Sequence, residues 1–376
     1  VRRQLPQATL PEVLRQAGYD TQLLGKWHVE PHPKLVGFDH VLFPKAHHLN
    51  ADQEYEDDSG RRFIVPGWNG QYESDRLREL LLSRRGAERP LFLYYNISLP
   101  HMPYFDVPRR YRTMYSRDEV VLRENVYREG ALAHDEHWFR IYLYDYLYYK
   151  LHRPGMDALP DGFDLRDLTA LYWGMVSAVD DLVGAMMEHL AEAALSEDTI
   201  VVFLSDHGDN LGSHHMWNKL DLIEESIRIP CMIHWPGGLA PRRIERQVIS
   251  QVDVMPTLLG LLGLPTPPHV QGTDLSAVVT GRSATAGENA AFIETHHNQV
   301  GVRTPTHVYG ILIDREHPRR PQPVTDERHM FFDLHSDPFQ LHDLARTDAH
   351  AKLASELRRR VLRWHEETPW LEPAAG

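Results

Sequence analysis

The sequence has a single cysteine among its 376 residues, at position 231. One thiol cannot form an internal disulfide, so a disulfide-stapled fold is excluded, and the redox compartment cannot be read from the cysteine content. The cysteine lies in a short apolar run at residues 229–233. That run predicts a buried strand, and we expect Cys231 to be an inert core thiol.

Long apolar runs are also missing. No run approaches the roughly eighteen residues that cross a bilayer as a helix. The first residues, Val1-Arg2-Arg3-Gln4, do not have a signal-peptide pattern. We therefore expect no membrane span. The cellular location stays open, because neither a periplasmic or secreted protein nor a cytoplasmic one is excluded.

Basic residues are too few for a general nucleic-acid binder. The chain has 40 Lys and Arg against 53 Asp and Glu, which gives a formal charge of −13. Nucleic-acid binding draws on counterion release by a basic surface, and none is evident here. An anionic ligand would have to be bound by a local cluster of basic side chains.

The residues that are present are typical of a globular protein, with 42% hydrophobic and 25% charged content. A chain of this length can form one large α/β domain plus a smaller one. It also has 24 histidines, which is more than packing requires. Their number indicates metal or proton-transfer chemistry, although an ordinary solvated side chain is the alternative for each single histidine.

Helix and strand signals alternate along the first 204 residues. Thr9 and Glu12 form a capping-box pattern before an apolar helical period that ends at Gly18. The continuous apolar run at 200–204 is typical of a central parallel strand covered on both faces. Further patterns predict strands at 21–25 and 90–97, and helices at 72–85 and from Leu165 onward.

This alternation predicts an α/β fold class, with a mostly parallel central sheet sandwiched by helices. A run of small residues around Gly281 predicts a domain boundary. We therefore expect a catalytic domain at 1–283 and a smaller C-terminal α+β subdomain at 284–376. Shorter signals predict strands at 308–313 and 330–333, a final helix at 353–364, and an insertion or helical cover at 105–165.

Reactive side chains follow three of the predicted strands: Lys26 with His28, then His101, then Asp206 with His207. In open α/β sheets, ligands bind outside the carboxyl ends of the strands, so this shared placement predicts one active-site crevice. Lys26 and His28 alternate along an extended segment and can point the same way. Together they would supply a positive charge for an oxyanion and a proton donor.

Asp206 and His207 offer adjacent oxygen and nitrogen ligands for a divalent cation, although two ligands do not complete a site. The alternative is a strand-end Asp that caps the next turn, with His207 as its hydrogen-bonded neighbour. For Lys26 and His28, taken alone, the alternative is a solvated turn. The sequence motifs around these residues are needed to choose between a functional site and these structural alternatives.

Six segments, in one order, resemble the sulfatase family of the alkaline-phosphatase-like superfamily. A single motif is moderately specific, whereas six in register extend across nearly the whole chain. They are Gly25-Lys26-Trp27-His28, Pro100-His101-Met102-Pro103, residues 204–209 with Trp217-Asn218-Lys219, residues 224–230, Asp253-Val254-Met255-Pro256-Thr257, and residues 332–338.

The resemblance implies a sulfuric-ester hydrolase that acts on a small-molecule or saccharide sulfate ester. It also implies roles for four residues. Lys219 would contact the sulfate. Lys26 and His28 would stabilise the sulfate and the surroundings of the nucleophile, and His101 would protonate the departing oxygen.

Two parts of the family's site are not found in the sequence. The family's nucleophile is a formylglycine, made from the first residue of a Cys/Ser-x-Pro/Ala-x-Arg motif, and Cys231 lacks the downstream Pro and Arg. The resemblance implies that Asp206 and His207 bind a calcium ion, but the Asp pair that completes the family's metal site is absent. We expect both parts before Val1, in an N-terminally incomplete chain.

Two other functions remain open. A phosphonate or phosphodiester hydrolase of the same superfamily can share the Asp-His pair and the Lys, although the Gly-Lys-Trp-His motif favours a sulfatase. A non-catalytic anion-binding relative would bind its ligand without turnover. The natural substrate and the oligomeric state stay open as well. Residues that could meet a sugar or aryl group, or be ordinary surface, are His47, His48, Trp68, His296 and His297.

Overall fold

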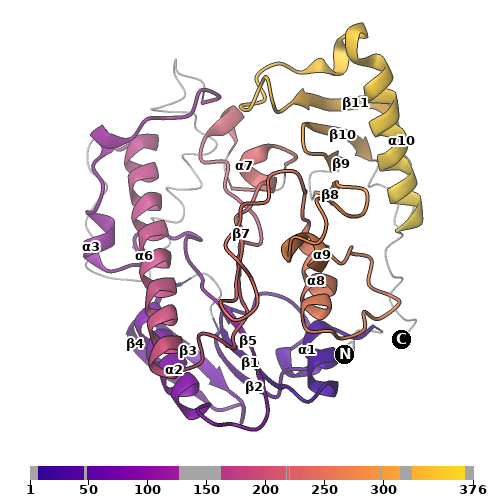
Figure 1. The fold of residues 1–376 in the computed structure, drawn as a ribbon. Coiled ribbons are helices and arrows are strands. Elements are labelled where there is room, and N and C mark those ends of the chain that lie inside the picture. Colours follow the sequence, from indigo (N-terminus) through magenta and orange to yellow (C-terminus); the bar gives the residue numbers. More distant parts are fainter. Residues whose placement is uncertain are drawn as a thin grey trace, which may run out of the picture. The chain divides into compact units, whose positions relative to one another are not determined.

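The structure is a computed structural model that describes residues 7–45, 49–126, 162–216, 218–219, 221–295, 299–313 and 324–368 (Figure 1). The chain forms two compact units. The first holds residues 1–122, 128–200 and 235–237, and the second holds residues 123–127, 201–234 and 238–376. The domain boundary that the sequence places after residue 283 stays a prediction.

The first unit is built on a five-stranded sheet with the order β4-β3-β2-β1-β5. Strand β1 (Asp20–Gly25) pairs in parallel with β2 (His40–Pro44) and β5 (Leu91–Asn96). Strands β3 (Ala51–Asp57) and β4 (Arg62–Trp68) continue the sheet in antiparallel orientation. The sheet is therefore mixed, and its parallel part contains the two strands that lead to Lys26 and His101.

The helix after Thr9 and the helix from Leu165 begin where the sequence predicts them, whereas the helix predicted at 72–85 begins at Asn69 and ends at Ser83. The capping box of α1 (Leu10–Gln16) is present, since the Thr9 hydroxyl accepts from the Glu12 amide at 3.4 Å and Glu12 accepts from the Thr9 amide at 2.9 Å. Helices α2 (Asn69–Ser83) and α6 (Leu165–Glu192) pack side by side (Figure 1). Shorter helical turns are η1 (Pro33–Val36), α3 (Arg109–Arg112) and η2 (Arg117–Glu119).

The second unit contains an antiparallel sheet with the order β11-β10-β9-β8. Helix α10 (Ala351–Glu367) packs against β9 and β10, and its Leu357 and Val361 share a buried core with Val300 and Tyr309. This confirms the predicted C-terminal strands and final helix. The strands are β8 (Ala291–Glu294), β9 (Gln299–Arg303), β10 (His307–Ile313) and β11 (Val324–Asp333).

Strand β6 (Val201–Leu204) is present as predicted, but its predicted parallel pairing is not found in the described part of the chain. It pairs antiparallel with β7 (Cys231–His234), and its residues are half-buried. The other short elements of this unit are η3 (Ser213–His215), α7 (Glu224–Ile227), η4 (Gln251–Asp253), α8 (Val254–Leu261), α9 (Ser276–Val279), η5 (Leu344–Arg346) and η6 (Asp348–His350).

The architecture confirms an α/β fold with a smaller antiparallel sheet toward the C-terminus. Cys231 begins β7 half-buried, and burial raises the pKa of its thiol, which disfavours the reactive thiolate. None of the described helices combines the length and the apolar composition needed to cross a membrane. Most of the predicted tyrosine-rich insertion, residues 127–161, lies outside the described residues and stays a prediction.

Candidate functional site

Lys26 begins the segment that leaves the carboxyl end of β1. Its amide donates to the carbonyl of Asn96 at 2.9 Å, and the Asn96 side-chain amide donates back to the Lys26 carbonyl at 2.8 Å. Gly25 takes a φ of +91°, and a Cβ there would lie 2.3 Å from the Asn96 carbonyl oxygen. Only glycine fits this position, which explains on steric grounds why the Gly-Lys-Trp-His motif begins with glycine.

The rest of this segment is anchored through Trp27. The Trp27 indole packs edge-on against Phe38 at 5.9 Å and donates from Nε1 to the Pro31 carbonyl at 3.1 Å. Lys26 is half-buried, whereas His28 is exposed. The motif thus places a half-buried aromatic anchor between two polar side chains.

His101 lies in a turn that follows β5. Its amide donates to the Ser98 carbonyl at 3.1 Å, and its Nδ1 lies 2.6 Å from the Met102 carbonyl oxygen. A carbonyl only accepts, so Nδ1 carries the proton in the neutral ring and Nε2 is the nitrogen that can exchange one. His101 and Lys26 therefore lie on segments that follow two neighbouring strands of one sheet, β5 and β1.

A buried carboxyl, Glu73 on α2, lies beneath the end of β1. One of its oxygens accepts from the Tyr55 hydroxyl at 2.7 Å, and the other lies next to Gly25. Burial raises the pKa of Glu73 to about 8, although the Tyr55 hydrogen bond lowers it. Burial also raises the pKa of Tyr55 and of Tyr95, and the charge of Glu73 raises both further.

We expect Glu73 to make the unfolding free energy fall as the pH rises from about 5 to about 8. Its pKa is raised in the folded state, so the folded chain holds a proton that the unfolded chain has released, and the stability present at low pH is lost through pH 8. The slope is at most about 1.4 kcal/mol per pH unit. Urea unfolding at several pH values measures it.

In this test Glu73→Gln should flatten the pH profile, because glutamine keeps the acceptor for Tyr55 and cannot ionise. Glu79→Gln, on the exposed side of the same helix, is the matched control and should leave the profile as in the wild type. An unchanged slope in the Glu73 variant would mean that another group titrates.

In the second unit, Asp206 and His207 follow β6 directly. The Asp206 side chain is 82% exposed, its Oδ1 accepts from the His207 amide at 3.0 Å, and its Oδ2 lies 3.5 Å from His207 Nε2. His207 Nδ1 lies 2.7 Å from the Gly208 carbonyl. Two of the predicted donors are thus adjacent, but no group of three or more His, Cys, Asp or Glu within the described ranges is arranged to hold a metal.

The loop after His207 folds back on itself. The Gly208 amide donates to the Ser226 carbonyl at 2.8 Å, and a Cβ on Gly208 would lie 1.9 Å from the Glu225 carbonyl oxygen. Further on, the Asn210 amide donates to the Asn218 carbonyl at 2.7 Å. This pairing brings Asn218, the residue before Lys219, next to Asn210, four residues after Asp206. A site shared by Lys219 and Asp206 stays a proposal.

Side chains other than the candidate site residues hold this loop in place. Gln251 donates its amide to the Ser205 and Asp206 carbonyls at 3.1 and 2.5 Å. The buried Glu224 of α7 pairs with Arg303 of β9 at 3.2 Å. Sequence reasoning missed Gln251, Glu73 and Asn96, and only Asn96 had a signal, as a polar residue at a strand end.

Of the five residues that could meet a sugar or an aryl group, only Trp68 lies within the described residues. Trp68 packs its ring against Tyr111 at 5.7 Å and covers Gly70, so it has a packing role. The other four lie outside the described residues: His47, His48, His296 and His297.

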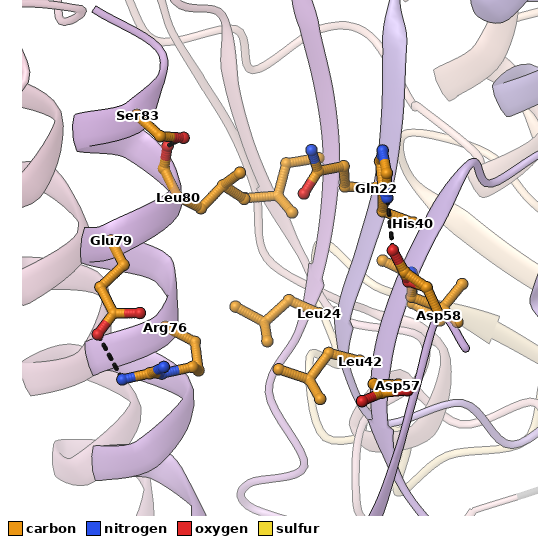
Figure 2. A pocket seen from close by; sticks show the side chains of 13 residues that line it. Gln22, Leu24, His40, Leu42, Asp57, Asp58, Arg76, Glu79, Leu80 and Ser83 are labelled. Atoms are coloured by element: carbon orange, nitrogen blue, oxygen red, sulfur yellow. Dashed lines mark hydrogen bonds and ion pairs between the residues drawn. The ribbon is translucent and has the colours of Figure 1, made fainter. Parts of the chain in front are cut away.

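A cavity of about 450 Å³ lies between α2 and the first-unit sheet (Figure 2). Leu24 and Leu42 point into it from the strands, and its rim is charged. Two pairs of rim charges interact with one another, Arg76 with Glu79 and His40 with Asp58. None of the candidate residues lines this cavity, so it is not the site that the sequence predicts.

The sequence and the structure are similar to those of known proteins. The sulfatase family model matches residues 1–264, and the model described as the C-terminal part of N-sulphoglucosamine sulphohydrolase matches residues 212–367. The chain belongs to the sulfatase family. This family works with a formylglycine and a divalent metal in general, and the six candidate residues lie on the segments that resemble its motifs.

An ulvan-active sulfatase of Formosa agariphila is 25% identical over 364 residues, which cover 93% of this chain and 64% of the relative. A multifunctional alkaline phosphatase superfamily protein of Trinickia caryophylli is 27% identical over 308 residues, covering 77% and 58%. This chain therefore spans less than two thirds of the length of these two relatives. A solved structure in complex with D-glucosamine-2-N,6-O-disulfate has a TM-score of 0.75 at 21% identity, covering 96% and 82%.

Proposed function

We propose that the protein is a sulfuric-ester hydrolase that releases sulfate from a sulfated saccharide. The observation that carries the proposal is the match to the sulfatase family over residues 1–264, which includes the strand ends at Lys26, His101 and Asp206. A lysine and a histidine at neighbouring strand ends of one sheet suit an anionic ester whose leaving oxygen needs a proton.

In this proposal Lys26, His28 and Lys219 bind the sulfate oxygens and offset their charge. His101, with both ring nitrogens protonated, gives its Nε2 proton to the oxygen that leaves sulfur, so the alcohol departs neutral and the ring returns to its neutral form with the proton on Nδ1. The formylglycine of the family supplies the nucleophilic hydroxyl, and no Cys or Ser of the 376 residues stands in the required motif. The nucleophile is therefore assigned to a residue outside this sequence.

Asp206 and His207 are the proposed ligands of a divalent metal, and of Ca²⁺ in particular. One carboxylate and one imidazole supply part of the six to eight ligands, roughly, that calcium takes. The described residues do not complete such a site, so no step of the reaction is derived through the ion.

A saccharide substrate is supported by two comparisons. The Formosa agariphila relative is named for its activity on ulvan, and the similar solved structure holds a disulfated glucosamine. We propose a sulfated sugar on this basis. The position of the sulfate on the sugar is left to experiment.

A substrate panel tests the proposal on a form extended by the coding sequence upstream of Val1. We expect sulfate release from a glucosamine sulfate and from an aryl sulfate, and at least about tenfold slower turnover of a phosphonate monoester and a phosphodiester. The rival substrates are included because the Trinickia caryophylli relative is named multifunctional. Faster turnover of the phosphorus esters would favour the rival hydrolase, and tight sulfate binding without turnover would favour the non-catalytic reading.

A further inference from the structure

Asn96 is the side chain that joins the two candidate segments of the first unit. It ends β5, and its side-chain amide donates to the Lys26 carbonyl at 2.8 Å while its own carbonyl accepts from the Lys26 amide at 2.9 Å. From Asn96 the chain runs on into the turn that presents His101. One residue therefore bonds to the Lys26 backbone on both sides and begins the segment that leads to His101.

The strand register explains why a side-chain amide is needed here. Gly25 with Asn96 is the last pair of the β1–β5 ladder, and the β1–β2 ladder already ends at Leu24 with Leu42. Beyond these pairs the Lys26 carbonyl has left the regular ladder, and a partly buried carbonyl without a donor is destabilising. The Asn96 amide supplies that donor.

We propose that Asn96 is a positioning residue: it fixes the Lys26 backbone against β5 and so directs the Lys26 ammonium toward the sulfate. This inference rests on the proposed sulfatase function. Gly25 supports it from the other side, because the left-handed turn there lets Lys26 approach Asn96 closely. Asn96 touches no substrate in this account and acts through Lys26.

The test is Asn96→Asp in the form extended upstream of Val1. Aspartate keeps the shape but replaces the donor with a carboxylate that repels the Lys26 carbonyl. We expect kcat/KM to fall about tenfold, the effect of losing one hydrogen bond of about 1.4 kcal/mol. The fall should be equal for an activated aryl sulfate and for a saccharide sulfate, because Lys26 acts on the sulfate and not on the leaving group.

A second measurement needs no activity. In the 376-residue chain, amide hydrogen exchange of residues 26–29 should quicken about tenfold in the variant, while exchange within β1 stays as in the wild type. Asn289→Asp is the matched control, since Asn289 also donates its amide to a backbone carbonyl, that of Arg246 at 2.8 Å. It should change neither measurement. Asn96→Ala replaces the Asp variant if that variant fails to fold.

The outcomes separate this inference from the proposed function. Unchanged exchange and unchanged kcat/KM in an active enzyme would reject the role of Asn96 alone. A larger loss on saccharide sulfates than on aryl sulfates would also reject it, because that pattern belongs to the His101 turn. An extended wild-type form that releases no sulfate from any ester would reject the proposed function, and with it the directing role of Asn96.

Discussion

The 376-residue chain by itself should release no sulfate from 4-nitrophenyl sulfate, even at high enzyme concentration and with added calcium. None of its Ser residues, nor Cys231, is followed by x-Pro/Ala-x-Arg, so no residue can become the family's formylglycine. The half-buried Cys231 has a raised thiol pKa, which disfavours it as a substitute nucleophile. A sulfate-release assay on the purified chain measures the result.

The same chain should bind calcium weakly, with a Kd above about 10⁻³ M, because Asp206 and His207 supply only part of the ligands that the ion takes. Isothermal titration calorimetry measures this. The control is the form extended upstream of Val1, expressed in a host that makes formylglycine, which should show both turnover and tighter binding. Turnover by the unextended chain would contradict this account of the nucleophile.

Local signals in the sequence predicted the helices well. Thr9 with Glu12 and the apolar period after Leu165 both became helices with the predicted starts, because capping and amphipathic spacing act within a few residues. Strand β1, which precedes Lys26, and strand β5, which ends at Asn96, were also predicted. Short apolar runs bounded by polar residues are typical of strands.

Strand pairing was harder to predict. The three strands β2, β3 and β4 lie in a stretch in which no elements were predicted from the sequence. Strand β3, Ala-Asp-Gln-Glu-Tyr-Glu-Asp, lacks the β-branched run of a typical strand, whereas β2 and β4 contain short apolar runs that were missed. The run at 200–204 predicted a strand, but not its antiparallel pairing with β7. An apolar run indicates that a strand is buried, but it does not indicate whether the strand pairs in parallel or antiparallel orientation.

For the candidate site, the sequence predicted the reactive residues but not the residues that hold them. Placement after strand ends predicted Lys26, His101 and Asp206, because the carboxyl ends of strands collect ligand-binding residues. The residues that hold these segments, Asn96 and Gln251, act through single hydrogen bonds to backbone carbonyls, which no spacing in the sequence reveals. The roles of the six candidate residues remain proposals.

His101→Ala, in the form extended upstream of Val1, should lower turnover of a saccharide sulfate about 10²–10⁴-fold and of an activated aryl sulfate far less. A saccharide alkoxide is a strong base and must be protonated as it leaves, whereas a nitrophenolate leaves readily without a proton. In this proposal His101 delivers the proton from Nε2, because its Nδ1 lies 2.6 Å from the Met102 carbonyl and donates to it.

The measurement is kcat/KM for a series of sulfate esters plotted against the pKa of the leaving alcohol, for the wild type and the variant. The variant should show the steeper dependence, since it lacks the acid that offsets poor leaving groups. His40→Ala is the matched control, because His40 begins β2 and pairs with Asp58 at 2.6 Å, and it should leave the dependence as in the wild type. Equal losses across the series would remove His101 from the role of general acid, and would leave it a structural part of the turn after β5.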